Sequence, residues 1–462
     1  MKIAFMVSEM YPLIKTGGLA DVAYALPKAL KKRGEDIRIF IPKYLQIDTK
    51  KLDDLKLVES IEFKNEVYNI LEGKLENVTV YLIENRSFFE RDTIYDSFDR
   101  DLQFAIFSEI SLRALEKLQF KPDVIHLNDW QTGLIPYLLK IKSEKNYFYK
   151  DIKTLFTIHN LRYQGIFGKE ALTYIDYPFR DSEVNYMKVG LLNSSKINTV
   201  SKTYAREIQT KYFGEGLEGV LQGRSHDLYG IINGIDYDIF NPETDLDLKS
   251  NYNIESIEKK KINKTSLQKY FGLTIDKDTA LISMVTRLDA QKGLDLLDRI
   301  ICELLDYDKL QIVILGSGME RYEKRLLALE KRYPEKLAVE IGYNAKLANQ
   351  IYAGSDMFLM PSQFEPCGLS QLIALKYGSV PIVRETGGLN DTIEAYNEFT
   401  SQGNGFSFSN YNAHDMMFTI RRALNMYYNF PKNWNEIMTK GMSQSFSWEE
   451  SAEEYLALYQ KL

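Results

Sequence analysis

The sequence predicts an α/β protein with two doubly wound, parallel-sheet domains followed by a terminal helix. Short apolar and β-branched runs alternate with helix-period segments in both halves of the chain, and a polar stretch separates the halves. At 462 residues the chain exceeds one typical domain. Near-continuous apolar strands between helices are typical of parallel sheets that helices cover on both faces. We therefore expect this architecture twice along the chain.

The expected strands are short and rich in apolar residues. In the first half they are "KIAFMV", "DIRIFIP", "VTVYLIE", "DVIHLND", "KTLFTIHN" and "INTVS", at 2–7, 36–42, 78–84, 123–129, 153–160 and 197–201. In the second half they are "ALISMVTRL", "LQIVILGSG", "LAVEIGY", "MFLMPS" and "VPIVRE", at 280–288, 310–318, 337–343, 357–362 and 380–385. A helix-period segment separates most neighbouring strands.

The polar segment 241–264, "NPETDLDLKSNYNIESIEKKKINK", marks the predicted domain boundary. Its lysine run indicates a solvated helix start rather than a binding patch. We expect an N-terminal domain over 1–240, a C-terminal domain over 241–445 and a terminal segment over 446–462. In that last segment apolar residues recur at helical spacing, and no strand follows. Such an amphipathic helix must dock on a surface that is already built.

Composition limits the partners and the compartment. The 64 acidic and 58 basic residues leave a net charge of −6. This mild acidity argues against general binding to nucleic acid or to a membrane surface. The apolar run that ends at Val7 is too short for a secretory signal, and we find no stretch of about 20 apolar residues. Because two cysteines make no disulfide framework, we expect a cytoplasmic protein.

Two nearly identical glycine loops occupy corresponding places in the two halves. "KTGGLAD" holds Lys15, Gly17, Gly18 and Asp21, and "TGGLND" holds Thr386, Gly387 and Gly388. Each follows an expected strand and opens an expected helix, so each belongs at the carboxyl edge of its sheet, where α/β proteins bind ligands. Glycines there let backbone N–H groups approach an anion. The alternative is that paired glycines only permit tight turns. Neither loop has the P-loop or GxGxxG spacing.

Four motifs resemble bacterial glycogen synthases and plant starch synthases, glycosyltransferase family 5. They are "KTGGLADV", "VTRLDAQKGLDLL", "PSQFEPCGLSQLIALKYG" and "RETGGLNDT". The resemblance is collinear from Lys2 to Leu462. It implies a GT-B fold, with an acceptor domain and a nucleotide-sugar domain facing across a cleft and the C-terminal helix crossing back to the first domain. It also implies transfer of glucose from ADP-glucose to the non-reducing end of an α-1,4-glucan, with retention of configuration, in glycogen biosynthesis.

Arg287 and Lys292 are the cations that we expect to contact the donor pyrophosphate. They flank the start of a helix after an expected strand, and Arg and Lys suit phosphate oxygens. Without the resemblance, two surface cations beside a helix cap would be the simpler interpretation. We expect no metal and no other cofactor. The aspartate pairs at 236/238, 245/247 and 276/278 indicate turns and caps rather than magnesium ligands.

Glu365 in "FEPCGL" is the expected catalytic carboxylate of the second domain. Its two alternative roles are covalent nucleophile and electrostatic stabiliser of the glucosyl group. The resemblance favours the stabiliser. For Cys367 we expect buried packing, since no histidine is near it in the sequence.

The remaining candidate site residues rest on the resemblance. It implies that His159 contacts the sugar as a catalytic residue, that Asp129 lies near the sugar, and that Asn233 lies at the cleft floor. The departures Asn128 and Gln131 stand where many bacterial relatives have histidines. Two aromatic residues are also expected in the substrate site: Tyr343 on the adenine side, with strand-end packing as the alternative, and Tyr95 in the acceptor site.

Two alternatives to a glycogen synthase stay open on the sequence. One is another GT-B enzyme that uses a UDP-sugar. The other is an inactive regulator that binds a nucleotide-sugar or a glucan. Binding without turnover would identify the regulator.

Overall fold

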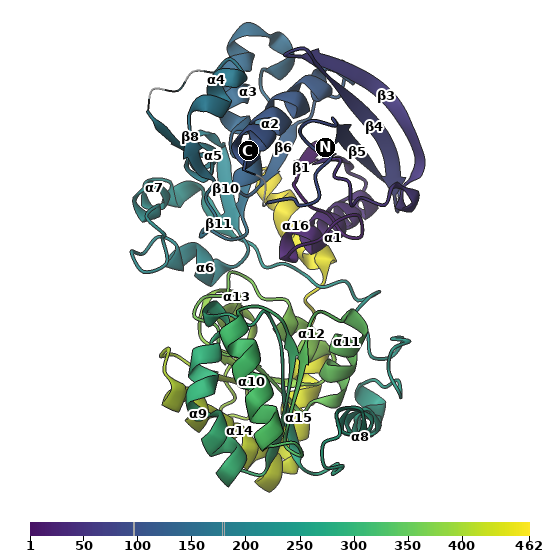
Figure 1. The fold of residues 1–462 in the computed structure, drawn as a ribbon, viewed down its shortest axis with the longest axis vertical. Coiled ribbons are helices and arrows are strands. Elements are labelled where there is room, and N and C mark those ends of the chain that lie inside the picture. Colours follow the sequence, from purple (N-terminus) through teal and green to yellow (C-terminus); the bar gives the residue numbers. More distant parts are fainter. Residues whose placement is uncertain (96–97, 178, 180) are drawn as a thin grey trace. The chain divides into compact units, whose positions relative to one another are not determined.

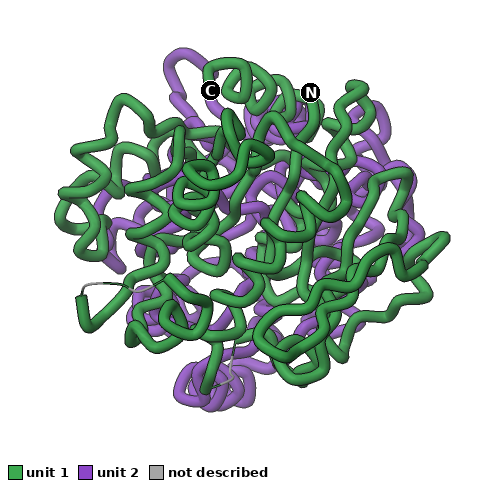
Figure 2. The backbone as a smooth tube through the Cα atoms, turned by 90° about the horizontal axis from the view of Figure 1, so that it is seen from above, with its two compact units in different colours: residues 1–234, 448–462 green, residues 235–447 purple. Residues whose placement is uncertain are grey.

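The chain forms two compact units. The computed structural model describes residues 1–95, 98–177, 179 and 181–462. The first unit comprises Met1–Gly234 and Trp448–Leu462, and the second comprises Ile235–Ser447 (Figure 2). The second unit is thus inserted between two parts of the first.

The described part of the first unit is built on a sheet with the strand order β11-β10-β7-β6-β1-β2-β5-β4-β3 (Figure 1). Its strands are β1 (Lys2–Met6), β2 (Asp36–Pro42), β3 (Asp53–Phe63), β4 (Glu66–Leu75), β5 (Val78–Glu84), β6 (Val124–Asn128), β7 (Lys153–Ile158), β10 (Lys196–Thr199) and β11 (Leu228–Gly230). The pairings from β11 to β5 are parallel. A separate antiparallel pair joins β8 (Ile166–Gly168) and β9 (Glu183–Asn185).

The antiparallel edge formed by β3 and β4 corrects the prediction of a purely parallel first sheet. β3 pairs with β4, and β4 with β5, in antiparallel register. The two hairpin turns place Lys64, Asn65, Glu76 and Asn77 at positive φ. Positive φ at both central residues is the signature of the two-residue turns that match strand twist. Only short stretches, such as "LKL" at 55–57 and "IEF" at 61–63, alternate apolar and polar residues, so the local signal for these hairpins is weak.

Helices cover both sides of the first sheet. They are α1 (Gly18–Lys32), α2 (Arg100–Lys117), α3 (Ile135–Lys145), α4 (Glu170–Tyr174), α5 (Tyr186–Asn193), α6 (Lys202–Glu207), α7 (Glu218–Gly223) and α16 (Trp448–Tyr459), with short 3₁₀ turns η1 (Thr49–Lys51), η2 (Trp130–Thr132), η3 (Tyr147–Tyr149) and η4 (Ser225–Asp227). Although α1 and α16 are far apart in the sequence, they lie side by side (Figure 1). The terminal helix therefore docks on the first unit, as predicted.

Helix α16 is anchored by buried polar contacts as well as by apolar packing. The hydroxyl of Tyr459 lies 2.6 Å from Nδ1 of His126 on β6, and Nε2 of His126 lies 2.6 Å from Oγ1 of Thr157. Burial holds the pKa of His126 well below its ordinary value. Asn198 donates a hydrogen bond to the hydroxyl of Tyr455. Fully satisfied buried networks of this kind specify one docking position.

The described part of the second unit contains a parallel sheet with the order β14-β13-β12-β15-β16-β17. The strands are β12 (Ala280–Val285), β13 (Leu310–Gly316), β14 (Leu337–Ile341), β15 (Met357–Met360), β16 (Val380–Arg384) and β17 (Phe406–Phe408). Its helices are α8 (Lys260–Phe271), α9 (Leu294–Tyr307), α10 (Glu320–Arg332), α11 (Ala345–Gly354), α12 (Ser370–Lys376), α13 (Gly387–Thr392), α14 (Ala413–Asn429) and α15 (Pro431–Ser443), with 3₁₀ segments η5 (Ile254–Lys259) and η6 (Ala290–Lys292).

The observed unit boundary precedes the expected domain boundary by six residues, because 235–240 belong to the second unit. The N–H of Ile235 donates to the carbonyl of Phe446, and the N–H of Phe446 donates to the hydroxyl of Tyr237. These contacts hold both ends of the inserted unit together. Main-chain pairing of this kind leaves no signal in composition.

The prediction of a solvated lysine run is wrong for Lys260 and Lys264. Lys260 is buried, and its ammonium donates to the carbonyls of Tyr352, Ala353 and Tyr377. Lys264 is buried and pairs with Asp356 at 2.6 Å. Both buried ammonium groups therefore have the hydrogen-bond or ion-pair partners that a buried charge requires. Charge runs alone do not reveal which lysines face the core.

Candidate active site

Each of the two large sheets has one position where its strand order reverses, and several of the candidate residues follow the carboxyl ends of the strands there. In the first unit that position lies between β1 and β6, and in the second between β12 and β15. Open α/β sheets bind ligands in the crevice outside such a switch point. Glu9 follows β1 and Asp129 follows β6, while Arg287 follows β12 and Glu365 follows β15. The topology of each unit therefore selects a group of candidate residues in that unit.

In the first unit, the glycine loop is held by the carboxylate of Glu9. Oε2 of Glu9 accepts hydrogen bonds from the N–H of Thr16 at 2.5 Å, the hydroxyl of Thr16 at 2.7 Å and the N–H of Gly17 at 3.3 Å. Burial raises the pKa of Glu9 above its ordinary value, and the Thr16 and Gly17 donors oppose this increase. Backbone N–H groups of this loop were expected to face a ligand, but those of Thr16 and Gly17 donate to Glu9 of the same unit.

Glu9 is not among the residues predicted from the sequence. An acidic residue between a buried strand end and a glycine loop was the available signal. Its burial depends on tertiary contacts, which no local pattern reveals.

Lys15 and Asp21 form an ion pair beside the same loop. Nζ of Lys15 lies 2.7 and 2.8 Å from the two carboxylate oxygens of Asp21. Burial raises the pKa of Asp21, and the charge of Lys15 opposes that effect. Gly18, the first residue of α1, is exposed. The structure thus brings the four predicted residues of this loop together.

Tyr95 lies against the end of β1 rather than on an open surface. Its hydroxyl is 2.9 Å from Oγ of Ser8, the residue before Glu9. Burial and the nearby Glu9 charge raise the pKa of Tyr95. Tyr95 therefore belongs to the surroundings of the first glycine loop.

Asp129 has a strained backbone at the end of β6. Its φ is 56° and its ψ is −174°, a region that residues other than glycine rarely occupy. Such strain costs about 1–3 kcal/mol and is concentrated at functional sites. Its Oδ1 accepts hydrogen bonds from the N–H groups of His159 at 2.7 Å and Asn160 at 3.4 Å. Burial raises the pKa of Asp129 to about 7, while the two N–H donors oppose the increase.

His159 is positioned by Asp129 and by Asn128. While its backbone N–H bonds to Asp129, its ring Nε2 lies 2.9 Å from Oδ1 of Asn128. Burial lowers the pKa of His159 to about 3, so the ring is neutral. This residue can therefore orient a hydroxyl group but does not carry a charge.

Two buried amide oxygens lie in the same unit. Oδ1 of Asn233 and Oε1 of Gln131 have no hydrogen-bond partner within the described part of the chain. Buried acceptors of this kind require an explanation in a native structure. Oδ1 of Asn233 is therefore able to accept a hydrogen bond from a ligand.

In the second unit, Arg287 and Lys292 lie on the loop between β12 and α9. The guanidinium of Arg287 is 3.4 Å from both Asp289 and Gln291, and its side chain is 55% exposed. Gly293 has a φ of 75°, and a Cβ there would lie 2.3 Å from the carbonyl of Pro361. The loop is thereby fixed against the end of β15.

Glu365 is paired with the second of these cations. Its Oε2 is 2.6 Å from Nζ of Lys292 and 2.9 Å from Oγ of Ser362. Ser362 is buried and is not among the residues predicted from the sequence. Oε1 of Glu365 has no hydrogen bond to another described residue. One oxygen is thus held in place while the other can contact a ligand.

The second glycine loop packs on the main chain next to Glu365. Thr386, Gly387 and Gly388 are all buried, and the N–H of Gly388 donates to the carbonyls of Glu365 and Pro366. A Cβ on Gly387 would lie 2.0 Å from the Glu365 carbonyl oxygen, and one on Gly388 1.9 Å from the oxygen of Cys367. These glycines are required by close packing. The N–H of Gly388 is therefore already engaged in this arrangement and is not available as the expected donor to a ligand.

The remaining predicted residues of the second unit differ in exposure and in their contacts. Tyr343, at the end of β14, is 79% exposed, so strand-end packing does not account for it. Cys367 is buried, as predicted. In each of the three aspartate pairs, the first carboxylate accepts the N–H of the second residue, which is the turn chemistry that the sequence predicted.

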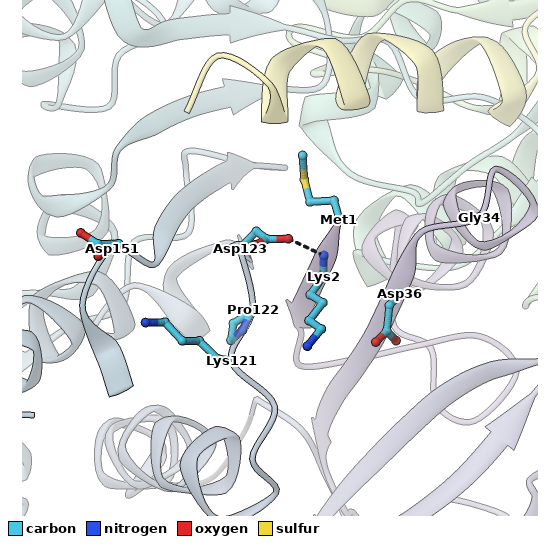
Figure 3. A pocket seen from close by; sticks show the side chains of 8 residues that line it. All are labelled: Met1, Lys2, Gly34, Asp36, Lys121, Pro122, Asp123 and Asp151. Atoms are coloured by element: carbon cyan, nitrogen blue, oxygen red, sulfur yellow. Dashed lines mark hydrogen bonds between the residues drawn. The ribbon is translucent and has the colours of Figure 1, made fainter. Parts of the chain in front are cut away.

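A pocket of about 520 Å³ lies away from these residues. It is lined by Met1, Lys2, Gly34, Asp36, Lys121, Pro122, Asp123 and Asp151, and Asp123 accepts the N–H of Lys2 (Figure 3). These residues mark the amino ends of β1, β2, β6 and β7, opposite the switch point. Within the described ranges we find no group of three or more side chains suited to a metal ion, and no helix long and apolar enough to cross a bilayer.

Two family models match this chain. Residues 2–223 match the starch synthase catalytic domain, and residues 268–440 match the glycosyl transferases of group 1. Together with two α/β units that carry polar residues at their switch points, these matches define a glycosyltransferase with the GT-B fold.

Relatives of similar sequence show to which family of glycosyltransferases the chain belongs. A glycogen synthase of Bacillus cereus (strain B4264) is 48% identical, and one of Clostridium novyi (strain NT) is 45% identical; the alignments cover 100% of this chain and 100% and 99% of those proteins. The chain therefore belongs to the glycogen and starch synthase family.

Solved structures agree with this assignment. The catalytic domain of starch synthase IV from Arabidopsis thaliana, bound to ADP and acarbose, has a TM-score of 0.90 at 33% identity and covers 100% of this chain and 99% of that one. Sucrose-phosphate synthase from Thermosynechococcus elongatus, at 16% identity and a TM-score of 0.62, covers 100% of this chain and 98% of that one. At that identity the match shows the fold alone.

Proposed function

We propose that the protein is a retaining glucosyltransferase that moves glucose from ADP-glucose to the non-reducing end of an α-1,4-glucan, in glycogen biosynthesis. The observation that carries the proposal is the cluster of Arg287, Lys292 and Glu365 at one switch point, with Lys292 and Glu365 2.6 Å apart. The relatives named glycogen synthase, and the starch synthase that binds ADP and acarbose, support this donor and acceptor.

The cations serve the leaving group. As the bond from glucose to phosphate breaks, negative charge grows on the departing ADP, and fixed positive charge lowers the energy of that state. Arg287 offers a planar fork of donors to phosphate oxygens, and Lys292 a single ammonium. Lys292 is already fixed by Glu365, so it loses little freedom when phosphate binds.

Glu365 then acts as an electrostatic stabiliser of the positive charge on the glucosyl group. Its Oε2 accepts from both Lys292 and Ser362, which holds the carboxylate in one orientation. The departing phosphate takes the proton of the acceptor hydroxyl on the same face of the sugar, and the configuration is retained. A glucosylated Glu365, trapped with a slow donor analogue and detected by mass spectrometry, would instead establish the covalent route.

The first unit contributes groups for the sugar. We propose that His159 and Asn233 hydrogen-bond sugar hydroxyls and that Asp129 lies beside the transferred sugar and keeps the 159–160 backbone in place. Lys15 and the glycines of its loop contact the donor, and Tyr95 lies next to them. Tyr343 stacks on adenine with its exposed ring. We propose that the enzyme acts without a metal and in the cytoplasm, in keeping with its two free cysteines.

The test is transfer of labelled glucose into a short α-1,4-glucan, with ADP-glucose or UDP-glucose as the donor and EDTA present. We expect incorporation from ADP-glucose that an α-1,4-specific amylase releases. Preference for UDP-glucose would overturn the donor, and loss of activity in EDTA that magnesium restores would overturn metal independence. Binding of ADP-glucose without turnover would favour a regulator.

The same assay tests the cation cluster. We expect Lys292→Ala to lower kcat by about 10²–10³, the effect of losing one electrostatic stabiliser. Lys324→Ala on α10 is the matched control, since Lys324 is exposed and, among the described residues, forms an ion pair with Glu320 of its own helix. Near-normal turnover of Lys292→Ala would refute its assignment.

A further inference from the structure

Asn128 is a buried side chain that the proposed function leaves without a role. It is the last residue of β6, it is fully buried, and it lies between β1 and the end of β7. Its Nδ2 donates to the carbonyl of Met6 on β1 at 2.9 Å, and its Oδ1 is 2.9 Å from Nε2 of His159. Asn128 thus connects the strand before the first glycine loop with the histidine of the sugar site.

The contact with Met6 fixes which way the Asn128 amide points. A carbonyl oxygen only accepts hydrogen bonds, so the group that faces Met6 must be the NH₂. The oxygen of the amide then faces His159. Because that oxygen also only accepts, Nε2 of His159 must carry the proton. The orientation follows from hydrogen-bond chemistry and does not depend on distinguishing the two amide atoms directly.

The tautomer of His159 follows from this chain of contacts. Since burial keeps the ring neutral, a proton on Nε2 leaves Nδ1 with a free lone pair. Nδ1 has no hydrogen bond to another described residue, and its histidine retains some exposure. The available nitrogen is therefore an acceptor, and it can bind the hydrogen of a hydroxyl but cannot donate to an oxygen.

Asn128 is itself held in place. Its N–H donates to the hydroxyl of Thr132 at 2.8 Å, and that hydroxyl donates to the carbonyl of Asp129. Asp129 in turn accepts the backbone N–H of His159. These contacts close a ring through Asn128, Thr132, Asp129 and His159, so the imidazole is oriented from its backbone and from its ring.

We propose that Asn128 is the positioning residue that selects the Nε2–H tautomer of His159 and so makes Nδ1 a hydrogen-bond acceptor for a hydroxyl of the transferred sugar. The sugar contact rests on the proposed function, whereas the tautomer does not. A histidine at position 128 would impose the same choice only if its own ring nitrogen acted as the acceptor.

The test begins with the tautomer, measured without any sugar. The chain has four histidines, so a ¹⁵N-histidine-labelled sample gives a simple spectrum, and His159→Gln identifies the signals of His159. Two-bond couplings between ring protons and nitrogens report which nitrogen carries the proton. We expect Nε2–H in the wild type, and a mixture or Nδ1–H in Asn128→Leu. Nδ1–H in the wild type, or an unchanged tautomer in Asn128→Leu, would overturn the proposal.

Two further variants separate tautomer selection from structural damage. Asn128→Asp keeps an acceptor toward His159, and we expect it to retain Nε2–H. If the leucine variant does not fold, the tautomer of the wild type remains the test, since Nδ1–H there overturns the proposal. Thr132→Val removes the neighbouring hydroxyl without touching the ring contact, and its tautomer should match the wild type. If Asn128→Asp and Thr132→Val both lost Nε2–H, the change of tautomer would come from a general disturbance of β6, and the proposal would be refuted.

Kinetics test the link to the sugar. We expect Asn128→Leu to lower kcat about 10-fold, with the KM for ADP-glucose changed less than about 3-fold, since one oriented hydrogen bond is lost in the reaction. Unchanged kcat despite an altered tautomer would overturn the sugar contact. A wild type with the expected tautomer but no transfer from any donor would refute the proposed function and leave the positioning role intact.

Discussion

The two TGG loops share three letters and a strand-to-helix position, yet different groups hold them. The first is largely exposed, and a single carboxylate, that of Glu9, accepts its N–H groups. The second is buried, and its glycines pack directly on the backbone of 365–367. A shared motif thus identifies the place of a loop in the fold, but its surroundings decide why glycine is needed.

This difference has a mechanical meaning. Movement of one side chain would release the N–H groups of the first loop to a ligand. The second loop cannot move without displacing the main chain that carries Glu365. We therefore expect the first loop to adapt to the substrate and the second to keep the catalytic carboxylate in position.

Among variants of the two loops and their anchor, the largest effect should come from Gly388→Ala. Its Cβ would meet the carbonyl oxygen of Cys367 at 1.9 Å, so the segment that carries Glu365 must shift. Such overpacking costs about 1–3 kcal/mol, and a displacement of about 1 Å at a reactive group can lower turnover about 10²-fold. Steady-state kinetics measures the loss of turnover, and thermal unfolding measures the loss of stability. Wild-type turnover would show that the second loop does not support Glu365.

A smaller effect is expected from Glu9→Ala. The N–H groups of Thr16 and Gly17 lose their acceptor, and the first loop becomes less ordered before the donor binds. We expect the KM for ADP-glucose to rise about 10-fold, or about 1.4 kcal/mol, with kcat less affected. Glu9→Gln, which keeps an acceptor oxygen, is the control and should lie closer to the wild type. An unchanged KM in the alanine variant would contradict the anchoring role.

Only the first loop should respond to pH through its anchor. Because burial raises the pKa of Glu9 above 4.5, the folded state binds more protons than the unfolded state in the pH interval between 4.5 and the raised pKa. The stability that Glu9 contributes therefore falls as pH rises through the raised pKa. Glu9→Gln lacks this titration, so the difference between its Tm and the wild-type Tm should shift in favour of the variant as the pH rises from 5 to 8. A pH-independent difference would argue against the burial effect.

The smallest effect is expected from Gly17→Ala. Gly17 has an ordinary extended backbone, with a φ of −152°, and the nearest atom to an added Cβ is Oε1 of Glu9 at 3.8 Å. The free energy of unfolding should change by no more than about 0.5 kcal/mol, and kcat/KM should stay within about 3-fold of the wild type. A loss as large as that of Gly388→Ala would mean that the two loops are supported alike.

Local patterns predicted much of the fold. The segments expected as strands at 36–42 and 78–84 coincide with β2 and β5, and the terminal helix docks on the first unit. These elements could be predicted because apolar periodicity is a local property. The hairpins of β3 and β4 were missed because their turns use Lys64 and Glu76 beside asparagine, without glycine or proline.

The candidate site was predictable where its chemistry is local. Arg287, Lys292 and Glu365 lie on loops after strands, and the structure brings the last two together. Glu9 and Ser362 were missed, since each acts through a partner that the fold alone supplies. The burial of Lys260 was missed for the same reason: three carbonyls from distant segments make it possible.

The docking of α16 on the first unit has a consequence for the order in which the units fold during synthesis. Residues 448–462 complete a core whose other members precede Gly234, and the whole second unit is translated between them. A nascent chain can therefore finish its second unit before its first. Until α16 arrives, His126 and its neighbours on β6 lack the tyrosine hydroxyl that covers them, so the first unit matures last although it is made first.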